Sequence, residues 1–194
     1  MNGGDKNAAA VFVDRDGTLI REVGHLHRRD QVEILPGAAE AIRLLRARGY
    51  CVVVVTNQSA VARGLLTEAE LGMIHEELKA RLAQEGVHLD GIYYCPHHPT
   101  EGKGAYRCDC DCRKPNTGMI VKAAAELGVE PSRSYVVGDQ ASDMVLADRV
   151  GAKGVRIADP GVEGDATGSK HPVVADLWQA ARWIVGERGP FPER

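Results

Sequence analysis

Two carboxylates stand immediately after an apolar run near the start of the chain. The run covers residues 8–13 and ends in Asp14-Arg15-Asp16-Gly17-Thr18. Four to eight apolar and β-branched residues that stop at a turn signal are typical of a buried parallel strand. Side chains just beyond the carboxyl end of such a strand lie in the crevice where α/β folds bind ligands. Asp14 and Asp16 could there hold a hard cation, and one of them could attack an electrophile.

Two further apolar strands also end in polar groups. Residues 51–55 are followed by Thr56-Asn57-Gln58-Ser59, and residues 135–138 are followed by Asp139, with Asp143 four positions later. Between them, Arg113-Lys114-Pro115 precedes a predicted helix. The carboxyl ends of parallel strands meet at one edge of a sheet, so these groups should converge. Phosphate esters repel nucleophiles, and such a set of metal ligands and cationic side chains relieves that repulsion.

Alternating strands and helices must position these groups. We expect strands at 8–13, 51–55, 92–95, 135–139, 154–157 and 173–174, and helices at 36–48, 67–84, 119–127, 142–150 and 177–185. This order predicts an α/β, Rossmann-like fold with a central parallel sheet and helices on both faces. We expect one domain over residues 1–194, without a large cap domain. Residues 159–170 and a tail at about 187–194 should be mobile, and His75 should lie on the surface.

Composition narrows the classes of partner. The 194 residues are 44% hydrophobic and 26% charged, with a formal net charge of −3. No overall positive field would attract nucleic acid or an anionic membrane. Five cysteines, an odd number, without a secretory signal argue against a disulfide framework. We therefore expect a cytoplasmic protein, and a monomer because no exposed apolar run stands out.

Four of the five cysteines crowd into one short segment with little to bury. This zinc-binding loop, at about 95–112, offers six nitrogen or sulfur ligands, which are Cys95, His97, His98, Cys108, Cys110 and Cys112. Tetrahedral zinc bound by thiolate and imidazole stabilises such loops. Four protein ligands would leave no open position, so the zinc would be structural.

Together, the four chemical motifs resemble those of the haloacid dehalogenase-like phosphatases over residues 8–157. The resemblance implies that Asp14 is the nucleophile, which forms an aspartyl-phosphate. It implies that Asp16 protonates the leaving oxygen and then deprotonates the attacking water. A catalytic Mg²⁺ would be held by Asp14, the backbone carbonyl of Asp16, and Asp139.

The same resemblance gives roles to the cationic and polar groups. Thr56 would donate its hydroxyl to the phosphoryl oxygens, Lys114 would neutralise them, and Asp143 would orient Lys114. Gln140 stands where some relatives have a lysine, which removes one possible cation from the site.

The cysteine segment resembles the zinc loop of the histidinol-phosphate and heptose-bisphosphate phosphatases. Aligned on Arg113-Lys114-Pro115, it selects Cys95, His97, Cys110 and Cys112 as ligands. Cys108 in place of Cys110, or His98 in place of His97, remains open.

That likeness implies a small-molecule sugar bisphosphate as substrate. The expected reaction removes the C7 phosphate of heptose 1,7-bisphosphate, on the way to nucleotide-activated heptose for lipopolysaccharide. Histidinol phosphate is the alternative substrate. A non-catalytic phosphate-binding zinc module is a third reading, which would predict the loss of Asp14 or Asp16.

Without a cap domain, loops must select the substrate. The polar loop at 19–31 follows the first strand and carries Glu22 and His25. Further candidate substrate contacts are Asn57 and Gln58 after the second strand, Arg63, and Arg113 beside the lysine.

Overall fold

The computed structural model describes residues 8–158 and 170–187. Six parallel strands form one sheet in the order β3-β2-β1-β4-β5-β6. The strands are β1 Ala10–Val13, β2 Cys51–Asn57, β3 Gly91–Cys95, β4 Tyr135–Gly138, β5 Lys153–Ile157 and β6 Val173–Val174. The helices are α1 Ala38–Ala47, α2 Ser59–Ala62, α3 Glu68–Gln84, α4 Gly118–Leu127, α5 Ala141–Val150 and α6 Leu177–Glu187.

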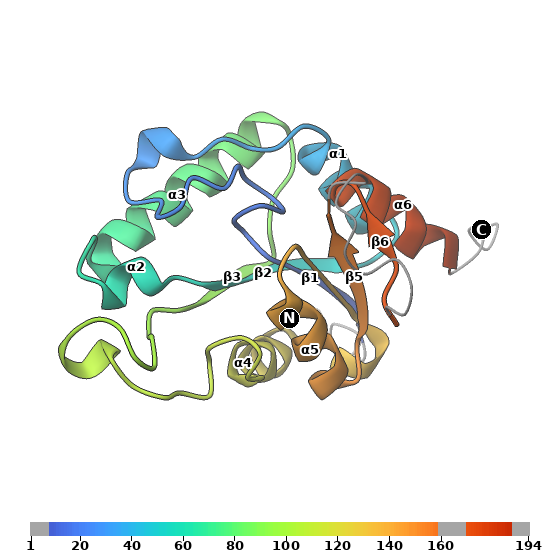
Figure 1. Ribbon diagram of the computed structural model, residues 1–194. Helices are drawn as coiled ribbons and strands as arrows, with labels where there is room; N and C mark the ends of the chain where they lie inside the picture. The colour runs from blue at the N-terminus through green and yellow to red at the C-terminus, as the bar shows by residue number, and fades with distance from the viewer. Residues whose placement is uncertain (1–7, 159–169, 188–194) are drawn as a thin grey trace.

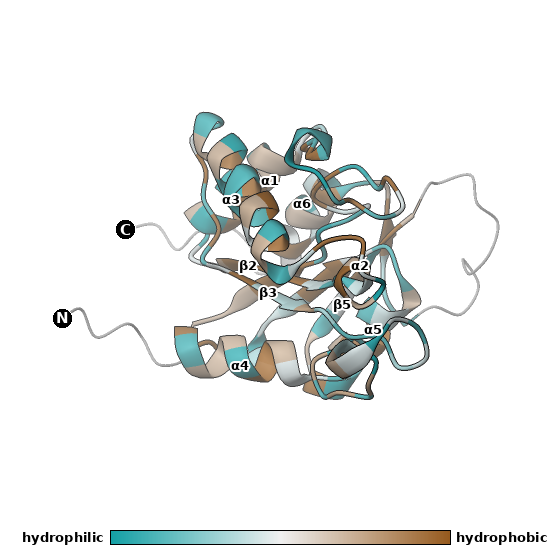
Figure 2. Ribbon diagram, turned by 90° about the vertical axis from the view of Figure 1, so that its left-hand side faces the viewer, coloured by the Kyte–Doolittle hydropathy of each residue, from teal (hydrophilic) through white to brown (hydrophobic). Residues whose placement is uncertain are grey.

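Helices cover both faces of the sheet, as the alternation of elements predicts. Figure 1 shows α1, α3 and α6 on one face and α4 and α5 on the other. Two apolar cores fill the space between the layers, one on each face. Figure 2 shows hydrophobic residues gathered on the strands between the two helical layers. Because β1 is buried on both faces, every one of its residues is apolar.

The central position of β1 fixes the place of the site. β1 lies between β2 and β4, with Val13 opposite Val54 on one side and Val137 on the other. From β1 the chain adds β2 and β3 on one side, and the connection from β3 then crosses to β4 on the other side of β1. This reversal makes the end of β1 a topological switch point. The residues that follow β1, β2 and β4 are therefore adjacent.

Local signals explain several helix boundaries. Thr67 and Glu70 form the capping box that begins α3. Gly128 and Gly151 end α4 and α5 in the left-handed conformation. The short helix α2 and the 3₁₀ turns at Arg29–Gln31, Gly104–Tyr106 and Pro131–Arg133 were not expected.

One placement on α3 was wrong. His75 was expected on the surface, but only 5% of it is exposed. It lies four residues after Leu71 and three before Leu78, so helical spacing puts it on the buried face.

The two segments predicted to be mobile are residues 159–170 and the tail at about 187–194. Apart from residues 170 and 187, both lie outside the described residues. Within the described part of the chain, no helix has the length and apolar character to cross a membrane.

Candidate active site

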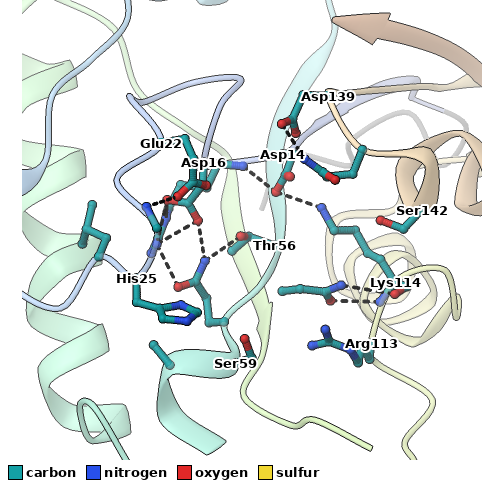
Figure 3. Close-up of a pocket in the computed structure, with 17 residues that line it drawn as sticks. Asp14, Asp16, Glu22, His25, Thr56, Ser59, Arg113, Lys114, Asp139 and Ser142 are labelled. Atoms are coloured by element: carbon teal, nitrogen blue, oxygen red, sulfur yellow. Dashed lines mark hydrogen bonds and ion pairs between the residues drawn. The ribbon is translucent and has the colours of Figure 1, made fainter. Parts of the chain in front are cut away.

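A polar pocket opens at the carboxyl ends of β1, β2 and β4 (Figure 3). Asp14 and Asp16 follow β1, Thr56 and Asn57 close β2, and Asp139 follows β4. The pocket is lined by Asp14, Arg15, Asp16, Glu22, Gly24, His25, Leu26, Thr56, Asn57, Gln58, Ser59, Ala60, Arg113, Lys114, Asp139, Gln140 and Ser142. The structure thus brings together most of the residues that the sequence singled out.

Asp14 is fixed at the floor of the pocket. Its backbone N–H donates to the carbonyl of Val137 at 2.9 Å, which extends the pairing of β1 with β4. Its Oδ1 accepts the backbone N–H of Arg15 at 2.7 Å and lies 2.8 Å from Lys114 Nζ. One carboxylate oxygen is thereby held while the side chain still faces the pocket (Figure 3).

Lys114 lies between two carboxylates. Its Nζ is 2.7 Å from Asp143 Oδ1 as well as 2.8 Å from Asp14 Oδ1, and only 4% of the lysine is exposed. Burial alone would lower the pKa of Lys114, but Asp14 and Asp143 outweigh it and raise that pKa. Burial raises the pKa of Asp143 to about 6, against the opposing effect of Lys114. The lysine is therefore cationic at neutral pH, and Asp143 is placed to orient it.

Asn57 holds the backbone of Lys114 at both ends. Its Oδ1 accepts the Lys114 N–H at 2.9 Å, and its Nδ2 donates to the Lys114 carbonyl at 3.2 Å. Asn57 was expected to contact substrate, and it does line the pocket. Both the oxygen and the nitrogen of its amide, however, bond the backbone of Lys114. The end of β2 thereby positions Lys114, which lies 57 residues later in the chain.

Gln58 is also turned toward the site itself. Its Nε2 donates to Asp16 Oδ2 at 2.7 Å and to Thr56 Oγ1 at 2.8 Å. Its Oε1 accepts from Arg15 at 2.8 Å. Gln58 was expected to bind substrate, and it lines the pocket with its polar atoms in contact with Arg15, Asp16 and Thr56.

Three carboxylates meet where a cation would fit. Oxygens of Asp14, Asp139 and Asp143 lie within 4.8 Å of one another. Asp143 already faces Lys114, whereas Asp139 Oδ1 is buried without a hydrogen-bond partner. Burial raises the pKa of Asp139, a hydrogen bond from Gln140 opposes this, and the charge of Asp14 raises it further. A divalent cation between Asp14 and Asp139 would satisfy the free oxygen and relieve the repulsion.

Gly17 leaves room for the Asp139 carboxylate, at the end of β4, to lie against the loop that follows β1. It has a φ of +74°, and a Cβ there would lie 2.7 Å from Asp139 Oδ2. A side chain at position 17 would therefore displace the carboxylate.

The cysteine segment forms a second group of ligands. Cys95, His97, Cys110 and Cys112 bring ligand atoms within 4.8 Å of one another, and the three Sγ atoms are 3.2–3.5 Å apart. His97 Nδ1 is 3.3 Å from Cys112 Sγ. Bonds of 2.3 Å to one zinc ion put tetrahedral sulfur atoms about 3.8 Å apart, slightly more than the distances here, so the group has about the size of a zinc site. Burial raises the pKa of Cys112 to about 11, which a bound cation would reverse.

The two open alternatives lie outside this group. Cys108 is not among the clustered ligands, and His98 Nδ1 accepts the backbone N–H of Glu101 at 2.9 Å. The structure therefore brings together the four residues that the motif alignment selects.

Of the four remaining predicted substrate contacts, three line the pocket and one does not. Glu22, His25 and Arg113 line the pocket, and Arg113 also donates to the His97 carbonyl at 3.0 Å. Burial raises the pKa of Glu22, followed by the charge of Asp16. Arg63 is not among the lining residues, because its guanidinium pairs with Glu101. The expected contact of Arg63 with substrate is not supported by this position.

Sequence reasoning missed Arg15 and His75. Arg15 is 1% exposed, contacts the carboxylate of Asp16, and lies 3.2 Å from His75 Nε2. Its position between two acidic residues and the spacing of His75 on the helix were the available signals.

Comparison with known proteins identifies the family. The family model described as haloacid dehalogenase-like hydrolase matches residues 21–151. The chain belongs to this family. It is 45% identical over 184 residues to D-glycero-beta-D-manno-heptose-1,7-bisphosphate 7-phosphatase of Pasteurella multocida, with 95% of each chain covered. It is 40% identical over 190 residues to the Escherichia coli K12 protein of that name, covering 97% of this chain and 94% of the other.

Solved structures of this family share the fold. The D,D-heptose 1,7-bisphosphate phosphatase from B. bronchiseptica, complexed with magnesium and phosphate, has a TM-score of 0.76 and 31% identity. The match covers 92% of this chain and 99% of that one. The corresponding phosphatase from Burkholderia thailandensis has a TM-score of 0.66 and 25% identity, with the same coverage.

Proposed function

We propose that this protein removes the C7 phosphate of D-glycero-β-D-manno-heptose 1,7-bisphosphate, in the synthesis of nucleotide-activated heptose. The observation that carries the phosphatase chemistry is the contact of Lys114 with Asp14, a buried cation beside a carboxylate that faces an open polar pocket. The substrate rests on the names of relatives that are 40–45% identical over nearly the whole chain.

The chain's own groups support an in-line double displacement. A carboxylate oxygen of Asp14 attacks phosphorus, the bond from phosphorus to the sugar oxygen breaks, and Asp16 gives that oxygen a proton. Water then attacks the phosphorus of the aspartyl-phosphate and gives a proton to Asp16. The bond from phosphorus to the Asp14 oxygen breaks, which releases inorganic phosphate and restores the Asp14 carboxylate. Lys114 and the Thr56 hydroxyl stabilise the charge on the phosphoryl oxygens.

Magnesium would be held by Asp14, Asp139 and the backbone carbonyl of Asp16. When bound, it neutralises charge on the phosphoryl group and positions it for attack. The unpartnered Oδ1 of Asp139 supports this assignment.

We further propose that Cys95, His97, Cys110 and Cys112 hold a structural zinc ion. All four positions of a tetrahedral site would come from the protein, which leaves none for substrate. The site would hold the segment that presents Arg113 and Lys114.

Substrate selection would fall to the mouth of the pocket. Glu22 and His25 lie on one side and Arg113 on the other (Figure 3). A carboxylate suits sugar hydroxyls, and a guanidinium suits the second phosphate. A small-molecule substrate, a monomeric state and a cytoplasmic location complete the proposal.

Phosphate release tests the proposal directly. With Mg²⁺, we expect one equivalent of phosphate from the β anomer of heptose 1,7-bisphosphate, and slower release from the α anomer and from histidinol phosphate. A preference for histidinol phosphate would keep the mechanism and overturn the substrate. Release from none of the three would contradict the proposed function, and Asp14→Asn serves as the blank.

A further inference from the structure

Arg15 is a buried cation that the reaction as described does not use. Its side chain is 1% exposed, although it adjoins the pocket. Nε donates to Asp16 Oδ1 at 3.1 Å, and Nη2 donates to both oxygens of Asp16 at 3.0 Å. Nη2 also donates to Gln58 Oε1 at 2.8 Å. A guanidinium is a rigid planar fork, so these contacts fix the direction of the Asp16 carboxylate.

The remaining nitrogen of Arg15 is held by His75, from a different layer of the molecule. Nη1 lies 3.2 Å from His75 Nε2 on α3. Burial lowers the pKa of His75 to about 3, with the charges of Arg15 and Lys79 acting in the same direction. The ring is therefore neutral, and Nε2 accepts the Arg15 hydrogen bond. The Tyr94 ring packs beside it, with centroids 5.4 Å apart.

The groups of this network that touch Asp16 come from Arg15 and Gln58, which line the pocket beside it. Oδ2 of Asp16 also accepts from Gln58 Nε2 at 2.7 Å, so donors reach both of its oxygens. His75 does not line the pocket. Its contact with the site is the one with Arg15.

We propose that His75 and Arg15 are positioning residues that hold Asp16 in line with the leaving oxygen of a phosphate monoester. The inference rests on the proposed phosphatase function. It adds two residues that orient Asp16, whose own side chain can rotate. The chemistry requires placement, because an alkoxide leaves only as its proton arrives, and small misplacements of a catalytic group cost much of its rate contribution.

Leaving-group dependence separates this role from a structural one. A primary-alkyl phosphate needs the proton of Asp16, whereas p-nitrophenyl phosphate releases a stable phenolate. The variant His75→Leu removes the acceptor and fills its place with an apolar side chain, which suits a buried position. The variant His75→Gln restores an acceptor near the position of Nε2. We expect His75→Leu to lower kcat/KM about tenfold or more for the alkyl ester and less than about threefold for p-nitrophenyl phosphate. His75→Gln should recover most of the loss.

The controls keep the two proposals apart. Heptose bisphosphate and histidinol phosphate are both primary-alkyl phosphates, so whichever the wild type hydrolyses serves as the alkyl ester. If the wild type hydrolyses neither of them, nor p-nitrophenyl phosphate, the proposed function and the positioning role fall together. Equal losses on both ester classes in a folded His75→Leu variant overturn the positioning role alone.

A second variant covers the case in which His75→Leu does not fold. Arg15→Lys keeps the charge and loses the planar fork, and should show the same selective loss for the alkyl ester. Met73→Ala, on the exposed side of α3, is the matched control and should leave both rates unchanged. Equal losses for the two esters in a folded Arg15→Lys variant would likewise contradict the proposal.

Discussion

Among the described residues, three of the four aspartates in the site face a cationic side chain, and the fourth, Asp139, does not. Lys114 faces Asp14 and Asp143, and Arg15 faces Asp16. Within the described residues, no lysine or arginine forms an ion pair with Asp139. A buried charge without a partner is costly, so this imbalance marks the Asp14–Asp139 side as the place for an added cation.

Asp14→Asn should abolish turnover and leave the fold intact. Asparagine keeps the shape of the side chain but has no charged oxygen to attack phosphorus. We expect kcat to fall by roughly 10³-fold or more, with an unchanged far-ultraviolet circular dichroism spectrum. Phosphate release above about one-hundredth of the wild-type rate would remove Asp14 as the nucleophile.

His75 should make the folded protein sensitive to mild acid. Its pKa is about 3 when folded and close to 6.5 when unfolded, so the unfolded chain binds the proton first as the pH falls. The stabilising effect of the neutral ring is therefore complete above pH 6.5 and is lost below it. Between pH 7 and pH 5, urea unfolding of the wild type should lose roughly 2 kcal/mol relative to His75→Gln. Parallel pH curves would show that His75 titrates normally.

At the scale of elements, the strands that carry the site were predictable and the contacts between layers were not. The runs at β1, β2 and β4 are apolar and stop at polar groups, because strands buried on both faces must end where the chain reaches solvent. The four clustered residues Cys95, His97, Cys110 and Cys112 could be selected by aligning the segment on Arg113-Lys114-Pro115. The partners of Gln58 and Arg63 could not be predicted, because Asp16 and Glu101 lie 42 and 38 positions away from them. His75 lies 60 positions from Arg15, which no local pattern reveals.

Cys110→Ser should affect metal content and folding together. Serine is a poor zinc ligand, and the segment from Pro96 to Cys112 has little apolar surface to hold it without metal. We expect less than half of the wild-type zinc and a lower Tm. Cys108→Ser is the matched control, since Cys108 lies outside the group, and should retain full zinc. A stable Cys110→Ser protein with full zinc would refute the ligand set.

At the scale of the whole molecule, the described residues form one sheet with two helical layers, and loops cover the pocket. Figure 1 shows the loop after β1 above the carboxyl ends of the strands, and the long loop between β3 and α4 to one side. Such a pocket is open to small substrates without a domain movement. Cations from solution should therefore reach it freely.

Magnesium should stabilise the whole protein through this site. A ligand that binds only the folded state raises stability by about 2.7 kcal/mol at 100 times its Kd. We expect Mg²⁺ to raise Tm by several degrees for the wild type and not for Asp139→Asn. The variant should also be more stable than the wild type without Mg²⁺, because the repulsion between Asp14 and Asp139 is gone. An equal Mg²⁺ response in both proteins would place the ion elsewhere.

The two hydrogen bonds between Asn57 and the backbone of Lys114 have a consequence for how such enzymes diversify. The Asn57 amide bonds a backbone N–H and C=O, as a neighbouring strand would. It therefore anchors the end of the loop between β3 and α4 to the sheet, whatever path the rest of that loop takes. Insertions and deletions before Cys110 can then accumulate without moving the lysine. No residue of 99–107 lines the pocket, so exchange of this segment between relatives should leave the position of Lys114 and the rate of phosphate release unchanged.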